Sequence, residues 1–177
     1  MKSLFNDAIA DGVVSADAYP FRKGRNGYQI PSIRNEPHPL TQAEISMLYK
    51  YEPANDSERR ARDFWIFSYL LNGANLKDVF SLRWGNIDAA SRRIKFFRSK
   101  TEKSARQQTA VIVALTDEMQ TIVERWGTKQ VDRQTHVFPV FEEGMTELEK
   151  HNRNEFERKV IRRNLKAIAA TIGLKRE

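Results

Sequence analysis

Residues 71–88 read LNGANLKDVFSLRWGNID. This stretch predicts the end of one helix and a short second helix, after which the predicted strands begin. The run 64–71 before it is apolar almost throughout, as in a helix buried in a core, and the Asn72-Gly73 pair ends it. Asn75 is suited to cap a short helix over 76–82, because its side-chain oxygen can accept from a first-turn amide. Trp84 then provides an apolar anchor where the chain leaves that helix.

Two strands follow. Segments 93–98 and 109–115 are rich in β-branched and aromatic residues and are joined by a polar, basic link, which predicts a β-hairpin. Segment 137–141 predicts a short extended or irregular stretch, because Pro139 lacks a backbone donor.

Helices account for most of the remaining pattern. A capping box at Thr41 and Glu44 predicts a helix from there to about residue 51, and another begins near 56–58. Apolar residues at helical spacing predict further helices over 3–14, 117–126 and 146–171. The chain is therefore expected to be α+β and mainly α, with one inserted β-hairpin or small sheet.

Charge points to a polyanionic partner. The 177 residues include 30 Lys and Arg but 23 Asp and Glu, a net charge of +7. Eight of the cations but only two acids lie between Arg83 and Gln107. This pattern favours a nucleic acid, although an ordinary solvated basic face remains an alternative reading.

Other function classes are disfavoured by composition. The sequence has no cysteine and only three scattered histidines, which excludes disulfides and thiolate catalysis and leaves little for a metal site. No apolar run approaches the roughly 20 residues of a membrane helix, and the N-terminus meets an acid before an apolar signal region can form. A protein inside the cell, without membrane association, is expected.

Four features occur here in a fixed order. A buried helix ends in a Gly turn, a short helix carries Asp78, a Leu-Arg-Trp follows at 82–84, and a hairpin presents Lys100 ahead of Thr101. This order resembles the catalytic domain of the tyrosine recombinases, the phage-type integrases, and above all those of Bacteroides-type mobile elements.

The resemblance implies roles for three residues. Lys100 would be the general acid toward the leaving 5′ oxygen, with Lys103 as a rival, and Asp78 would orient its neighbours. Asn75 occupies the position of the usual first catalytic Arg, but an amide cannot supply a guanidinium fork to a phosphate. Either another cation substitutes, with Lys77 and Arg83 the nearest in sequence, or the active site is weakened. The alternatives are a helix cap for Asn75, a helix-dipole charge for Asp78 and an ordinary exposed amine for Lys100.

The resemblance also implies partners. The intact protein would integrate DNA through a 3′-phosphotyrosyl intermediate, as a tetramer on double-stranded DNA in a bacterial cytoplasm, with neither metal nor cofactor. Contacts to the DNA backbone, which position a duplex without reading its sequence, are expected from six side chains, Arg83, Arg92, Arg93, Arg98, Lys103 and Arg106.

Two elements of the family pattern are missing. None of the histidines begins a His-x-x-Arg box, and no tyrosine follows Tyr69. We therefore expect a truncated protein: residues 1–16 as the end of a core-binding domain helix, 17–36 as a linker, and 37–177 as the first part of the catalytic domain. Such a fragment would retain at most DNA binding.

Two further interpretations come from other classes. The chain could be a non-catalytic DNA-binding accessory protein, for which Asn75 and the absent tyrosine would be native features. It could instead be a helical protein-interaction module whose basic hairpin is only solvated. Steep salt dependence of DNA affinity separates these two, because neutralising phosphates releases counterions.

Overall fold

The computed structural model describes residues 2–21, 27–28, 39–99, 109–129 and 132–174. It divides into two compact units, Met1–Pro39 and Leu40–Glu177. The domain boundary expected near Glu36, and most of the expected linker 17–36, lie outside the described residues.

The first unit contains α1, Lys2–Ala10, and a short 3-10 turn, Ala16–Ala18. Sequence periodicity predicted a helix as far as residue 14, but the helix stops earlier. Gly12 adopts a left-handed φ of 71°, and the amide of Val13 turns back to the carbonyl of Ala8 at 2.9 Å. This Gly-centred hydrogen-bond pattern is a common helix stop, so α1 is shorter than predicted.

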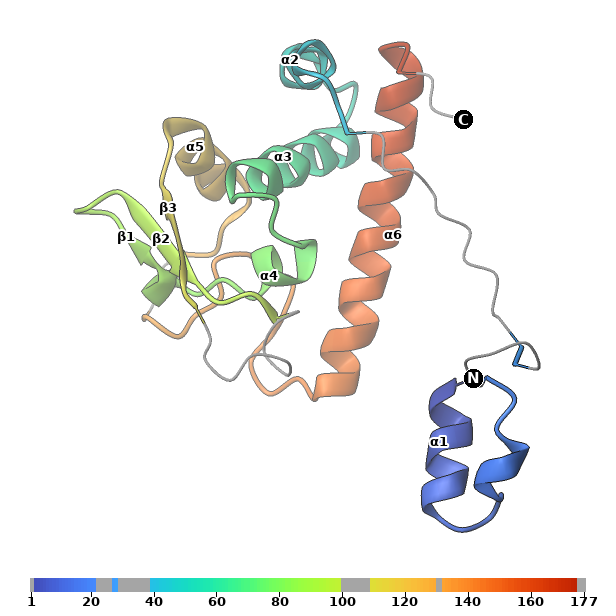
Figure 1. Ribbon diagram of the computed structural model, residues 1–177. Helices are drawn as coiled ribbons and strands as arrows, with labels where there is room; N and C mark the ends of the chain where they lie inside the picture. The colour runs from blue at the N-terminus through green and yellow to red at the C-terminus, as the bar shows by residue number, and fades with distance from the viewer. Residues whose placement is uncertain (1, 22–26, 29–38, 100–108, 130–131, 175–177) are drawn as a thin grey trace. The chain divides into compact units, whose positions relative to one another are not determined.

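The second unit carries the elements that concern function (Figure 1). It is mainly α with one small antiparallel sheet, so the predicted α+β class is confirmed. The elements in chain order are α2 Gln42–Lys50, α3 Asp56–Leu70, α4 Leu76–Phe80, a 3-10 turn Trp84–Asn86, β1 Ile87–Asp88, β2 Arg93–Phe96, β3 Val111–Ala114, α5 Asp117–Trp126 and α6 Glu147–Thr171. None of the helices described here is both long and apolar enough to cross a membrane.

The sheet has the order β1-β2-β3 with every pair antiparallel. Ile94 and Phe96 of β2 point into the core, while Arg93 and Lys95 alternate with them and face solvent. Lys95 pairs with Ile112 of β3, which is also exposed. The predicted hairpin of β2 and β3 is confirmed, and β1 is an addition that sequence did not predict.

Aromatic side chains form the centre of the core. Phe138 packs edge to face on Phe64 and Phe67 of α3, at ring-centroid distances of 4.9 and 5.2 Å. Phe80 of α4 meets Phe64 in the same way at 5.3 Å. All four rings are buried. Helix α3 thus packs against α4 and the 137–141 segment, with α5 and α6 on either side (Figure 1).

Residues 137–141, predicted to be extended or irregular, form no regular strand, and the segment 132–138 is held against residues 82–85. The amide of Val137 donates to the carbonyl of Leu82 at 2.8 Å, and that of Gly85 donates to the carbonyl of Arg133 at 2.8 Å. A Cβ at Gly85 would lie 2.9 Å from that carbonyl oxygen, so only glycine fits this close approach. These bonds position Arg83, Arg133 and His136 near the sheet.

Candidate nucleic-acid interface

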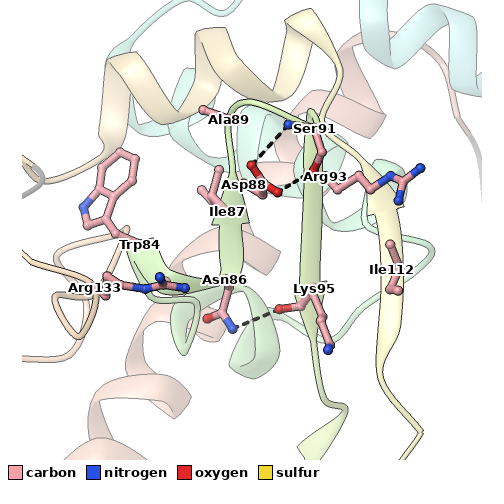
Figure 2. Close-up of a pocket in the computed structure, with 11 residues that line it drawn as sticks. Trp84, Asn86, Ile87, Asp88, Ala89, Ser91, Arg93, Lys95, Ile112 and Arg133 are labelled. Carbon is pink, nitrogen blue, oxygen red and sulfur yellow. Dashed lines mark hydrogen bonds between the residues drawn. The ribbon is translucent and has the colours of Figure 1, made fainter.

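The solvent face of the sheet carries a basic groove of about 760 Å³. We call it the outer-sheet groove. Figure 2 shows Arg93 and Lys95 on β2, with Ile112 beside them on β3 and Arg133 on the opposite side of β1. Among the described residues that line it, Asp88 is the one acid. Three cations against one acid make this groove attractive to an anion.

A tight turn between β1 and β2 engages the Asp88 carboxylate, which lies beside Arg93 across the β1–β2 pair. Ser91 donates to the Asp88 carboxylate from its hydroxyl at 2.6 Å and from its amide at 3.1 Å (Figure 2). These hydrogen bonds, and the nearby charge of Arg93, hold the pKa of Asp88 below its usual value. The Asp88 carboxylate therefore stays ionised, and both of its oxygens accept hydrogen bonds from Ser91.

Asn86 fixes the other end of the groove. Its side-chain amide donates to the carbonyl of Lys95 at 2.9 Å (Figure 2). Its side-chain carbonyl oxygen accepts from the amide of Arg83 at 2.7 Å. The 3-10 turn is therefore joined directly to β2. The strand that carries Arg93 and Lys95 is held in place by side-chain as well as ladder hydrogen bonds.

A second cavity, of about 390 Å³, lies where α4, the end of β2 and the first turns of α6 meet. We call it the α4–α6 pocket. Four cationic side chains line it, Lys77, Arg83, Arg98 and Lys150. Arg98 donates to the carbonyl of Asn72 at 2.7 Å, and Lys150 pairs with Glu147 at 2.9 Å. None of the described residues lines both the pocket and the outer-sheet groove.

Buried acceptors lie in the wall of this pocket. Asp78 is 4% exposed, and its Oδ1 accepts from the amide of Ser99 at 3.0 Å. Its Oδ2 has no hydrogen-bond partner among the described residues, and the same holds for Oδ1 of Asn154, which is 5% exposed. Because buried polar atoms are nearly always hydrogen-bonded, two orphan acceptors in one pocket mark it as unusual.

His136 lines the same pocket in a largely neutral state. Burial lowers the pKa of its imidazole, and the charges of Arg83 and Lys150 lower it further, while the Leu82 carbonyl acts in the opposite direction. The ring packs edge to face on Phe141 at 5.8 Å. At neutral pH His136 thus adds polarity to the pocket without adding charge.

The residues predicted from sequence fall into separate places. Asp78, Arg83 and Arg98 come together at the α4–α6 pocket, and Arg93 lines the outer-sheet groove. Arg92 lies in the turn between β1 and β2. Its guanidinium donates to the carboxylate of Asp117 and to the carbonyl of Leu115. Three predicted residues, Lys100, Lys103 and Arg106, lie outside the described residues.

Asn75 belongs to neither cavity. It is exposed and lines an apolar groove between α3 and α6 instead. Its backbone occupies the cap position of α4, and its carbonyl accepts from the amide of Val79 at 3.1 Å, but its side chain makes no capping bond. The interpretation of Asn75 as a side-chain cap was wrong, because an exposed amide loses little by bonding to water instead.

Lys150, His151 and Asn154 of α6 are among the residues of the α4–α6 pocket that were not predicted as site residues. They follow Glu147 at helical spacing, so that one face of the first turns of α6 lines the pocket. His151 is exposed. The spacing was present in the sequence, but nothing in it indicated that α4 would lie opposite.

Among the residues that the structure describes, no group of three or more His, Asp or Glu side chains is placed to hold a metal ion. Comparisons with family models, with curated proteins and with solved structures give no match to this chain. The resemblance to tyrosine recombinases therefore stands on the sequence features alone.

Proposed function

We propose that the Leu40–Glu177 unit binds double-stranded DNA through its outer-sheet groove, as part of a tyrosine-recombinase-type integrase that acts in site-specific DNA integration. The observation that carries the proposal is the placement of Arg93 and Lys95 side by side on the exposed face of β2, with Arg133 across the groove. Three cations are thus presented on one face by backbone that hydrogen bonds hold in place.

The geometry suits a phosphate backbone. Side chains two residues apart on a strand point to the same face and lie about 6.8 Å apart, so Arg93 and Lys95 can contact neighbouring phosphates together. Such contacts carry no sequence information and position the duplex instead. In this proposal the groove orients DNA, and Lys100, which follows β2 in sequence, supplies the general acid.

Catalysis by this mechanism needs groups that the sequence does not contain. All five tyrosines lie at or before residue 69, and none of the three histidines begins a His-x-x-Arg box. The contribution we propose for this chain is accordingly DNA binding, with strand exchange and tetramer assembly belonging to the intact bacterial recombinase.

The test is the salt dependence of duplex affinity, measured by fluorescence anisotropy with a labelled duplex. The double variant Arg93→Gln/Lys95→Gln should bind more weakly and make the slope of log K against log salt shallower by about 2, one for each lost phosphate contact. The matched control is Lys159→Gln/Arg163→Gln, which removes two exposed cations of α6 that line neither cavity.

Equal slopes for the two double variants would refute the groove as the DNA site. Absence of salt-dependent duplex binding in the parent protein would refute DNA binding altogether. The helical protein-interaction module would then be the better interpretation.

A further inference from the structure

The groove between α3 and α6 differs in character from the two cavities described above. Its volume is about 1070 Å³, and none of the described residues that line it also lines the outer-sheet groove or the α4–α6 pocket. We call it the α3–α6 groove. Its large apolar side chains include Leu40, Leu48, Trp65, Leu76, Ile161 and Leu165. An apolar surface rimmed by polar side chains is typical of a binding site for another protein.

One face of α6 forms a long wall of this groove. The α6 residues that line it recur at intervals of three and four from Arg158 to Ala170, so the wall is about three turns, or about 18 Å, long. Ile161 is buried in the floor, and Leu165 is half-buried. Side chains in this helical pattern form ridges with grooves between them, into which the ridges of another helix can pack.

The walls favour a helix over an extended peptide as the ligand. Trp65 and Ser68 lie within α3, and the α6 wall lies within a helix of 25 residues, so the backbone groups of both walls are paired inside their own helices. An extended peptide would find no strand edge there to pair with its amides and carbonyls. A helix satisfies its own backbone groups and can present apolar side chains to the groove.

The cations of the groove lie on one side. Among the described lining residues, all three cations, Arg158, Arg162 and Lys166, come from α6 at intervals of four residues, and none of the lining residues is an acid. Arg158 pairs with Glu155 at 2.5 Å. Arg162 and Lys166 are exposed and make no ion pair with any residue that the structure describes. The groove therefore complements a ligand with an apolar face and carboxylates along the edge next to α6.

We propose that the α3–α6 groove binds an acidic amphipathic helix of a partner protein. Apolar residues of the partner at helical spacing pack on Trp65, Leu76 and Leu165, and acids four residues apart on its edge contact Arg162 and Lys166. A DNA backbone can pair with the two cations, but it leaves the apolar side chains unmatched. This inference goes beyond the proposed function and does not depend on it, because no described residue of the outer-sheet groove takes part.

Fluorescence anisotropy of labelled peptides, titrated with the full chain, tests the proposal. The first probe is a peptide of about 15 residues with leucines on one helical face and glutamates beside them. The second replaces each glutamate by lysine, and the third has the composition of the first in an order that leaves no leucine face. The first peptide should bind most tightly, and each of the others should bind at least about tenfold more weakly.

One matched pair of variants tests the charges of the groove. Arg162→Gln/Lys166→Gln should weaken binding of the acidic peptide about fivefold, because two exposed ion pairs are lost. Lys159→Gln/Arg163→Gln removes two exposed cations of the same helix that do not line the groove, and it should retain most of the parent affinity. Both variants lower the net charge equally, so general attraction between protein and peptide falls equally in both.

A second matched pair tests the apolar surface. Ala170→Glu places a carboxylate and extra volume in the groove and should weaken binding of the acidic peptide about tenfold. Ala167→Glu makes the same change at an exposed position of α6 that does not line the groove, and it should have little effect. Both alanines are exposed, so both variants should fold.

Absence of binding by the acidic peptide, equal affinity for the acidic and the lysine peptide, or equal losses within either pair of variants would overturn the proposal. Phosphatidylglycerol vesicles are the remaining probe. If the protein binds them through Arg162 and Lys166 but does not bind the acidic peptide, the face is a lipid surface and the proposal is wrong. Arg93→Gln/Lys95→Gln should bind the acidic peptide as Lys159→Gln/Arg163→Gln does, so failure of the DNA proposal and failure of this one are distinguishable.

Discussion

The indole Nε1 of Trp126 donates a hydrogen bond of 2.8 Å to Oδ2 of Asp63, which joins the end of α5 to the middle of α3. The Asp63 carboxylate is fully buried. It also pairs with Arg125 at 2.5 Å and with Arg62 at 3.2 Å. Both oxygens are therefore satisfied, and a buried charge is stabilised by two cations and an indole.

Asp63→Asn should destabilise the protein by about 3 kcal/mol, because removing one partner of a buried ion pair leaves the cations uncompensated. Urea unfolding followed by tryptophan fluorescence measures the loss. Asp56→Asn is the matched control, since Asp56 pairs with Arg59 at an 84% exposed position and should cost less than about 1 kcal/mol. Similar losses for the two variants would contradict a structural role for the Asp63 cluster.

Local signals in the sequence predicted local structure well. The capping box of Thr41 and Glu44 forms as predicted, with both reciprocal hydrogen bonds present. The helix expected over 146–171 begins after Thr146, which caps it in the same way. These features depend on residues within one helical turn, so neither required knowledge of the tertiary fold.

Features that depend on tertiary packing were not predicted. Strand β1 has only two residues, too few for an alternating pattern, and it exists because β2 pairs with it. The grouping of Asp78 with Asn154 requires α4 to pack against α6, although the two residues are far apart in sequence. Charge counting identified the basic region but could not distinguish Arg93 in a groove from Arg92 in an ion pair with Asp117.

His136 should titrate below its ordinary pKa of 6.5, because burial and the charges of Arg83 and Lys150 disfavour the imidazolium. The unfolded chain then binds the proton more tightly than the folded one. The contribution of neutral His136 to the free energy of unfolding is therefore fully present above pH 6.5. It is lost as the pH falls through the lowered pKa of His136 in the folded protein.

NMR titration of the imidazole measures this pKa directly. Arg83→Gln should raise the pKa of His136 toward 6.5 without restoring it fully, since burial is the larger cause. Arg163→Gln, distant on α6, should leave the titration unchanged. A parent pKa at or above 6.5 would show that the imidazole is solvated.

Thr146→Ala should destabilise α6 by about 1 kcal/mol, because the N-cap hydroxyl accepts from the amide of Glu149 and no other group replaces it. Thr146→Ser keeps the hydroxyl and should cost much less. Amide hydrogen exchange in the first turn of α6 should accelerate in the alanine variant only. Equal exchange in the two variants would mean that packing against α4, rather than the cap, holds this turn.

Lys100→Ala should leave duplex affinity within about twofold, although Lys100 lies only four residues after the end of β2 in the sequence. The reason lies in the role proposed for it. A general acid acts on the leaving oxygen in the transition state, so it adds little to ground-state binding, whereas Arg93 and Lys95 contact phosphates of bound DNA in every state. Anisotropy at one fixed salt concentration compares Lys100→Ala with Arg93→Gln/Lys95→Gln. A loss for Lys100→Ala as large as that for the double variant would make Lys100 a phosphate contact and remove the ground for its catalytic assignment.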